Sequence, residues 1–488
     1  MLFNSYIFIF TFLPLAVIGY YVLHFFEWKK AAKIWLIGMS LWFYGYNNPM
    51  YLLVIGGSVV FNYLISKLFY CEKIKRAGRR AILAGGIFVN LLSIFFFKYY
   101  DFFIENVNAV LKKEYTLLHL VLPLGISFFT FQQISYLVDS YRKETENYGF
   151  VEYALFVTFF PQLVAGPIVL HDEIIPQFNK KEKVRFDFDL VSKGISFFVV
   201  GLFKKVLIAD TFGVVVATGW EQLYSLTSLE ALIVSLAYTF QIYFDFSGYC
   251  DMASGIAFMF GIQLPMNFDS PYKATSIIEF WKRWHMTLSR FLRKYIYFPL
   301  GGSRKGAVIT YVNVMVVFLA SGIWHGAGWT FLVWGLMHGL FYCFTKMFAK
   351  FWNRMHLVWQ WLITFVFVDF TWVIFRAPTI GDAVILIRKI LSMNDFNLKS
   401  VDLITAFWLP EFTWLENKIA VVGRVTNMIP AFWLWIWTIG ALFIVLNFEN
   451  KQRKKFVPSA LNAMGTAVLL LWSVVSLTGM STFLYFNF

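Results

Sequence analysis

The chain has 488 residues, 59% hydrophobic and only 14% charged, a composition that excludes an ordinary soluble domain and indicates an integral membrane protein. A net charge of +14 would suggest nucleic acid in a soluble protein, but here the basic residues lie in short loops between apolar runs, so we expect no nucleic-acid partner. Three scattered cysteines exclude a disulfide framework or a cysteine-based metal site.

Apolar runs long enough to cross a bilayer recur along the whole chain. They lie near residues 3–26, 34–70 (a hairpin broken at 47–49), 81–104, 117–139, 152–170, 191–209, 229–262, 306–345 (a second hairpin), 357–376, 432–447 and 459–479. The first run lacks a signal-peptide cleavage pattern, so we expect it to be retained. The pattern predicts an all-α integral membrane protein with about 11 spans, organised as one polytopic domain over residues 1–488.

Interrupted runs and basic loops indicate how these spans are arranged. Gly and Pro break the runs at 123–129, 159–167 and 260–268, which predicts re-entrant pieces facing a cavity rather than lipid. The residues from about 379 to 430 form the largest non-spanning part. Basic loops are expected on the cytoplasmic side, and they lie at residues 27–33, 72–80, 282–305, 346–354 and 450–455. The protein should therefore be a multi-pass protein in contact with membrane lipids.

Two acidic residues fall inside the apolar stretch 240–272. Asp245 and Asp251 lie six residues apart, on different faces of a helix, so they do not form a carboxylate pair for acid/base chemistry. Pairing with a Lys or Arg, or capping a broken helix, is the expected use of each. We also keep both as candidates for lining a tunnel.

The stretch 276–304 predicts an amphipathic helix at the cytoplasmic interface. Ser276 and Glu279 form an S-x-x-E capping box at its start. Its apolar stripe comprises Ile277, Trp281, Trp284, Leu288, Phe291, Leu292 and Tyr295. Its basic arc, on the opposite side, comprises Lys282, Arg283, Arg290, Arg293 and Lys294. Such a helix is either a lipid-headgroup anchor or the mouth where an anionic acyl donor binds, with His285 at the boundary of the two arcs.

The run from 306 to 345 is expected to cross the membrane and return, with its turn at SGIWHGAG, residues 321–328. His325 then lies at the outer or middle depth of the membrane and His338 on the returning helix. Thirteen residues separate them by about 20 Å on one helix, so they cannot share a metal ion, and we expect no metal site.

His325 is either a structural hydrogen-bonder at a turn or a neutral general base. Glycines 322, 326 and 328 favour the second reading, because they remove side chains and leave space for a substrate beside the imidazole. For His338, hydrogen bonding between helices and a role in lining a tunnel are equally consistent with the sequence. Trp324 is a further tunnel-lining candidate.

Motifs in the expected order resemble the membrane-bound O-acyltransferase (MBOAT) family, in its bacterial polysaccharide O-acetyltransferase branch. They are PLGISFFTFQQISYLVD, FFPQLVAGPI, QIYFDFSGYCDMA, LPMNFDSPY, FWKRWHMTLSRFLRKYIYFPLGG and GIWHGAGWTFLVWGLMHG, between about residues 120 and 340. The resemblance implies a multi-helix bundle around a central tunnel. It also implies that His325 is the principal catalytic histidine and His285 the second.

The resemblance further implies that the membrane is the bacterial inner membrane, and that acetyl transfer starts from a cytoplasmic donor, acetyl-CoA, with no bound cofactor. The acetyl group would pass to an extracytoplasmic SGNH-type acetyltransferase that modifies alginate, peptidoglycan or a related glycan. The basic residues 282, 283, 290, 293 and 294 would bind the donor phosphates. At the chain end, STFLYFNF resembles an aromatic motif of this branch, and Tyr485 is either a transient acyl acceptor or an interfacial anchor.

Three other functions are consistent with parts of this pattern. D-Alanyl transfer from a carrier protein to teichoic acid belongs to the same chemistry. A transporter or flippase of a lipid-linked saccharide would use intramembrane Asp and His as relay groups. A noncatalytic scaffold for a periplasmic enzyme explains neither the broken helices nor the glycines beside His325.

Overall fold

The computed structural model describes residues 1–180, 184–429, 431–453, 456–477 and 482–484, and it is helical without strands over these residues. The first half contains α1 (Leu13–Phe25), α2 (Lys29–Gly45), α3 (Tyr51–Leu68), α4 (Arg76–Ile94), α5 (Tyr100–Leu111), α6 (Ile126–Arg142), α7 (Phe150–Thr158), α8 (Phe160–Leu163), α9 (His171–Phe178), α10 (Phe188–Phe203), α11 (Asp210–Glu221) and α12 (Ser228–Met259). The all-α class predicted from hydropathy is confirmed.

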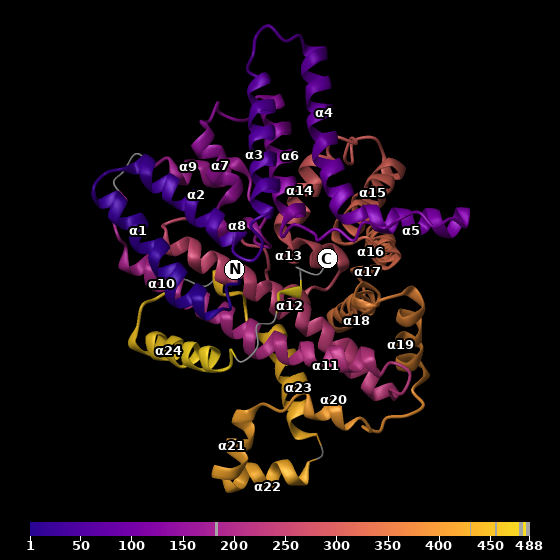
Figure 1. Ribbon diagram of the computed structural model, residues 1–488. Coiled ribbons are helices and arrows are strands. Elements are labelled where there is room, and N and C mark those ends of the chain that lie inside the picture. Colours follow the sequence, from indigo (N-terminus) through magenta and orange to yellow (C-terminus); the bar gives the residue numbers. More distant parts are fainter. Residues whose placement is uncertain (181–183, 430, 454–455, 478–481, 485–488) are drawn as a thin grey trace.

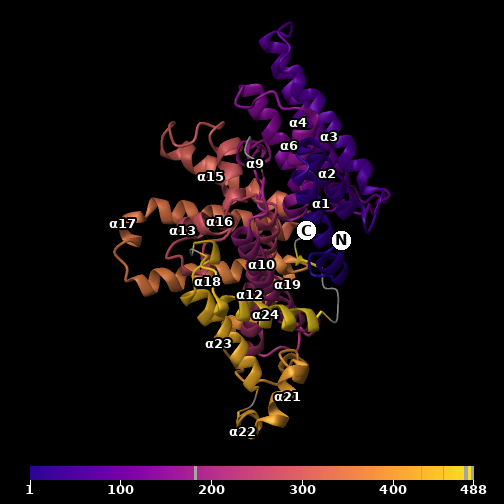
Figure 2. The same cartoon turned by 90° about the vertical axis from the view of Figure 1, so that its left-hand side faces the viewer.

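The second half contains α13 (Ile277–Arg283), α14 (Met286–Leu292), α15 (Ala307–His325), α16 (Trp329–Met347), α17 (Ala349–Trp352), α18 (Leu357–Arg376), α19 (Ile380–Ser392), α20 (Val401–Thr405), α21 (Pro410–Lys418), α22 (Ala420–Met428), α23 (Phe432–Asn447) and α24 (Ala460–Val475). Widened π-helical turns occur at η2 (Phe95–Tyr99), η3 (Lys204–Ala209) and η5 (Arg293–Tyr297). Figures 1 and 2 show α21 and α22 projecting from one end of the molecule, beyond α23, within the stretch expected not to span.

Helix α12 is the centre of the bundle (Figure 1). Its most apolar window is 78% buried, against 17 to 44% for the other candidate spans. The helix begins with a capping box, because the Thr227 side chain accepts from the Glu230 N–H and the Glu230 carboxylate accepts from the Thr227 N–H. It contacts α10 at backbone distance, since a Cβ on Gly201 would lie 2.5 Å from the carbonyl oxygen of Gly248. Small residues allow this approach between membrane helices.

Seven helices among the described residues are long and apolar enough to cross a membrane. This number is lower than the predicted 11 because several apolar runs fold as shorter helices. Examples are α2 and α6, each of 17 residues. The break predicted at 47–49 is confirmed, because α2 ends at Gly45 and α3 begins at Tyr51.

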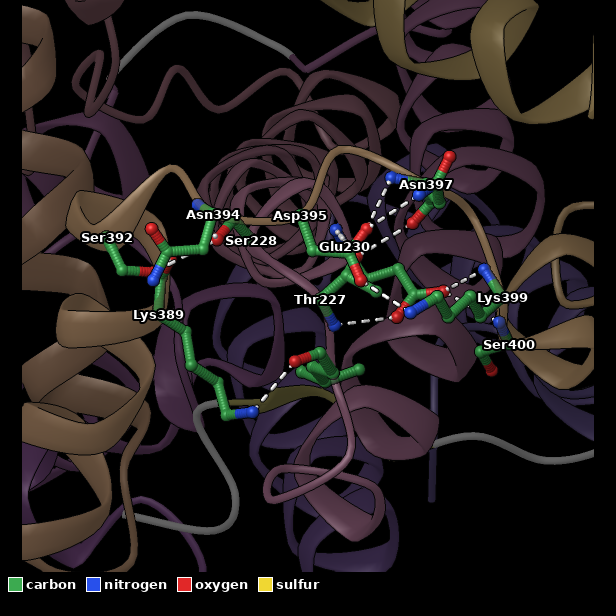
Figure 3. A network of polar contacts seen from close by, with 11 residues as sticks. Thr227, Ser228, Glu230, Lys389, Ser392, Asn394, Asp395, Asn397, Lys399 and Ser400 are labelled. Carbon is green, nitrogen blue, oxygen red and sulfur yellow. Dashed lines mark hydrogen bonds and ion pairs between the residues drawn. The ribbon is translucent and has the colours of Figure 1, made fainter.

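A polar network fixes the loop that follows α19 onto the first turn of α12 (Figure 3). One oxygen of Glu230 accepts from the backbone N–H groups of Lys399 and Ser400, both at 2.6 Å. Thr227 donates to the carbonyl of Asn397 at 2.9 Å. These contacts hold the start of α20, and so the chain that leads to the projecting helices α21 and α22, against the buried central helix.

Candidate active site

His325 is the last residue of α15, and Gly326 to Gly328 connect that helix to α16, as predicted for the turn of this hairpin. The helix ends there because Gly326 takes an extended conformation, with φ −165° and ψ 157°. Figure 2 shows α15, α16 and α18 lying alongside one another, so the end of α15 lies within a layer of helices. The His325 side chain is 3% exposed.

Aromatic rings surround the His325 imidazole. The ring centroids of Trp324, Trp334 and Phe375 lie 4.8, 5.1 and 5.2 Å from it, all in edge-on contact. Trp324 also lies 5.9 Å from the ring of His285. One indole therefore contacts both histidines that the sequence singled out.

The glycines near His325 serve helix packing, which corrects our prediction that they open space for a substrate. A Cβ on Gly322 would lie 2.4 Å from the carbonyl oxygen of Phe331, and one on Gly326 would lie 2.0 Å from the Phe331 ring. Those volumes are already filled by α16. Only Gly328 has ordinary clearance, with its nearest atom at 3.4 Å.

His285 lies at a sharp break in the stretch expected to form one amphipathic helix. The single helix is wrong: α13 ends at Arg283, α14 begins at Met286, and His285 has a left-handed conformation with φ 42°. Half of the expected capping box is present: Ser276 accepts from the Glu279 N–H, whereas the Glu279 carboxylate accepts from the N–H of Thr275 rather than that of Ser276. The break turns His285 into the protein, where it is fully buried, and burial lowers its pKa to about 3.

Asn267 determines which nitrogen of His285 carries the proton. Its Oδ1 accepts from the backbone N–H of Thr287 at 3.2 Å and lies 3.1 Å from Nδ1 of His285. Because a backbone N–H only donates, the atom facing it is the amide oxygen, and Nδ1 of the neutral imidazole donates to that same oxygen. The basic lone pair of His285 is therefore on Nε2.

His338 has a structural position between three helices. Its Nδ1 accepts from the Trp281 indole N–H at 3.2 Å, so the proton of the neutral ring is on Nε2. Nε2 donates to the Thr371 hydroxyl at 3.0 Å, and that hydroxyl donates to a carbonyl of its own helix. The sequence left two roles open for His338, hydrogen bonding between helices and lining a tunnel. Hydrogen bonds that join α13, α16 and α18 occupy both of its ring nitrogens, which favours the first role.

The two aspartates kept as tunnel candidates form buried ion pairs instead. Asp245 pairs with Lys205 at 2.7 Å and Asp251 with Lys204 at 2.6 Å, and both carboxylates are 2% exposed as residues. The lysines come from η3, so the prediction of pairing with a basic residue is confirmed. Asp245 also accepts from the backbone N–H of Leu484 at 3.0 Å, which holds residue 484 against the buried helix α12.

A cavity of about 290 Å³ opens beside α15 and is lined by three cations. We call it the basic cavity. Its lining residues are Ile278, Trp281 and Lys282 of α13, Ser289 and Leu292 of α14, Arg293 and Tyr297 of η5, Val314, Val317, Phe318 and Ser321 of α15, and Tyr342 and Lys346 of α16. Ser321 is the lining residue nearest to His325, one helical turn before it, which is about 6 Å along the axis.

Three of the five basic residues expected to bind the donor are held by carboxylates. Arg283 pairs with Glu279 at 2.7 Å, Arg290 donates to Glu173 at 2.8 Å, and Lys294 donates to Asp139 at 3.0 Å. Lys282 and Arg293 are exposed and line the basic cavity. Of the five basic residues predicted to bind the donor, only these two therefore stay as candidates.

Comparison with known proteins gives the chemistry of this arrangement. Residues 138–380 match the model of the MBOAT, membrane-bound O-acyltransferase family. The chain is 40% identical to a peptidoglycan O-acetyltransferase of Helicobacter pylori over 526 aligned positions, which cover 100% of this chain and 98% of the relative. The chain belongs to the membrane-bound O-acyltransferase family. It is a membrane O-acyltransferase, and its named relatives include O-acetyltransferases.

Other relatives extend this family assignment. A protein named probable alginate O-acetylase AlgI, of Pseudomonas putida, is 34% identical, with 100% of both chains covered. A teichoic acid D-alanyltransferase of Bacillus subtilis is 26% identical over 62% of this chain and 79% of the relative. The MBOAT resemblance inferred from the motifs is therefore confirmed.

The sequence analysis missed two residues of this candidate site. Lys346 was used only as a topology signal, although it lines the basic cavity from α16. Asn267 lies in a motif that we quoted, but its contact with His285 joins residues 18 positions apart and has no local signal. Tyr485 lies outside the described residues.

Proposed function

We propose that this enzyme takes acetyl groups from acetyl-CoA on the cytoplasmic side of the bacterial inner membrane and passes them across it. The acetyl groups serve O-acetylation of an extracytoplasmic polysaccharide, such as alginate or peptidoglycan. The names of the relatives at 40% and 34% identity support this substrate class. The positive-inside distribution of the loops supports the orientation.

The basic cavity is the observation that carries the proposal. Lys282, Arg293 and Lys346 line it and would attract the phosphates of the donor. Its apolar lining includes Val314, Val317 and Phe318 of α15. A volume of about 290 Å³ is at the lower end for small-molecule sites, so it suits the thioester arm of acetyl-CoA rather than the whole molecule.

In the proposed reaction, an acceptor hydroxyl attacks the thioester carbonyl carbon while His325 takes the hydroxyl proton. The carbon–sulfur bond breaks, and the proton passes from the imidazole to the departing thiolate, giving an ester and free CoA. General-base assistance contributes about 10² to 10⁴ in rate. His285, with its lone pair on Nε2, is the second histidine of the proposed site.

The acceptor hydroxyl belongs to Tyr485 or to an extracytoplasmic partner, for which an SGNH-type acetyltransferase is our proposal. Tyr485→Phe keeps the ring and removes only the hydroxyl. Unchanged glycan acetylation in that variant would eliminate Tyr485 as a carrier and leave it as an aromatic anchor.

The deciding experiment supplies labelled acetyl-CoA to the purified protein in liposomes and measures CoA release and labelled ester on an acceptor. We expect His325→Ala to lose at least about a hundredfold in rate while inserting normally. His119→Ala is the matched control, because this side chain is 79% exposed. Equal rates for His325→Ala and the wild type would exclude His325 as the base.

D-Alanyl transfer is the second candidate, favoured by the similarity to the teichoic acid enzyme. It requires a thioester-linked carrier protein as donor. Turnover with a D-alanyl carrier and none with acetyl-CoA would select it.

A further inference from the structure

The carbonyl groups at the end of α15 are bound by side chains from the opposite half of the chain. The Lys98 ammonium donates to the carbonyls of Trp324 at 2.7 Å and His325 at 3.0 Å. The neighbouring Tyr99 hydroxyl donates to the carbonyl of Ile323. Three consecutive carbonyls, ending with that of His325, are therefore satisfied from η2.

These contacts supply hydrogen-bond donors that the end of α15 lacks within its own helix. The last four carbonyls of a helix have no partner within it, and within a membrane protein such groups need protein or water partners. α15 ends in an extended residue rather than a capping turn of its own. A cation at this position also interacts favourably with the negative end of the helix dipole.

The local geometry of η2 explains how adjacent residues reach the same helix end. Phe95 to Tyr99 form a π-helical turn between α4 and α5, and such turns interrupt the regular α-helical pattern. The following helix holds the other side of the hairpin turn, since Asn106 of α5 accepts from the Trp329 indole N–H at 3.0 Å. The segment from η2 to α5 thus contacts the end of α15 and the start of α16.

We propose that Lys98 is a positioning residue for His325: its ammonium holds the last two carbonyls of α15 and so fixes the backbone from which the imidazole projects. Lys98 lies outside the 138–380 region matched by the family model. The catalytic part of this inference rests on the proposed function of His325. A misplacement of about 1 Å at a catalytic group can reduce the rate about a hundredfold.

The first test measures kcat and KM for acetyl-CoA in Lys98→Met. We expect kcat to fall at least about tenfold and KM to change less than about twofold, because Lys98 does not line the basic cavity. Lys98→Arg keeps N–H donors and should recover most of kcat. Lys67→Met is the matched control, because Lys67 also lies in a candidate span and donates to a backbone carbonyl, that of Tyr148, at 2.6 Å.

The second test uses hydrogen–deuterium exchange and is independent of the donor. We expect faster exchange in peptides covering residues 319–328 for Lys98→Met, and wild-type exchange there for Lys67→Met. If Lys98→Met does not insert, Lys98→Gln, which retains a shorter donor, is expected to show the same changes to a smaller degree.

The outcomes separate the two proposals. Wild-type kcat and exchange in the Lys98 variants would overturn the positioning inference. A wild-type protein that turns over no acetyl-CoA, but shows the expected exchange change in Lys98→Met, would overturn the donor assignment and retain the contact. A loss in which KM rises and kcat stays constant would also overturn the inference, because it would place Lys98 in donor binding.

Discussion

Gly322→Ala tests whether the glycines of the hairpin are required for packing. The added methyl would lie 2.4 Å from the Phe331 carbonyl oxygen and 3.4 Å from the Cα of Gly335. Ordinary contact begins near 3.4 Å, and a backbone oxygen cannot rotate away, so α15 and α16 have to separate locally by about 1 Å. Overpacking of this kind costs about 1–3 kcal/mol, while replacing a helical glycine by alanine returns up to about 1 kcal/mol.

Taking the middle of the first range less the full gain, we expect a net destabilisation of about 1 kcal/mol, measured as a lower unfolding temperature and faster thermal inactivation in detergent. Gly328→Ala is the control, because its Cβ would have ordinary contacts at 3.4 to 3.7 Å. It should stay within about 0.5 kcal/mol of the wild type and retain activity. Wild-type stability in Gly322→Ala, or loss of activity without loss of stability in Gly328→Ala, would refute the packing explanation and restore the substrate-space explanation.

Three further predictions concern charge. Arg293→Gln should raise KM for acetyl-CoA, more at low than at high salt, and leave kcat nearly unchanged, because this residue lines the basic cavity. Asp245→Asn should destabilise the protein by about 1.5–3 kcal/mol in thermal unfolding, since it removes the closest carboxylate of a buried lysine that keeps a second ion pair, with Asp210 at 2.9 Å; no measurable loss would refute a stabilising role for the pair. Burial raises the pKa of Glu279, but hydrogen bonds from Thr275 and Arg283 outweigh it and hold the pKa below its ordinary value. The carboxylate therefore contributes stability above about pH 4.3, which is lost as the pH falls through the folded pKa, and Glu279→Gln should flatten the decline of unfolding temperature in that acidic range.

Hydropathy and turn residues were enough to predict the hairpin that carries His325. The run 306–345 is apolar throughout, and Gly326 and Gly328 interrupt it at its middle, so a helix, a turn and a helix follow from length alone. The same reasoning located the buried position of His325. Its packing partners were beyond sequence reasoning, because Phe331 and Phe375 reach the turn through the association of α15, α16 and α18.

The break at His285 could not be predicted for a related reason. The apolar stripe from Ile277 to Tyr295 continues through it with helical spacing, and neither Gly nor Pro marks it. The left-handed conformation depends on Asn267, which bonds to His285 and to Thr287 on the two sides of the break. Tertiary contacts here override a local pattern that favours one continuous helix.

The basic arc was misinterpreted in part because a charge pattern does not reveal its partners. Arg290 and Lys294 are paired with carboxylates from α9 and α6, more than one hundred positions away in the chain. An arginine facing a carboxylate at hydrogen-bond distance is already neutralised and attracts a phosphate weakly. Only a residue whose charge remains exposed at the cavity, such as Arg293, retains that function.

The burial of His325 has a chemical consequence for a thioester enzyme. A general base open to water would activate water as readily as an alcohol, and the donor would be hydrolysed. With 3% exposure and three aromatic rings around the imidazole, water has little access to His325. In the proposed reaction an acceptor oxygen has to come within about 3 Å of the base, and movement of one of these rings would admit it. Trp334 is the ring best placed for this, because it contacts His325 and also Trp281 in the wall of the basic cavity. In the proposed mechanism, arrival of the thioester arm and access to the base would be coupled through this one side chain.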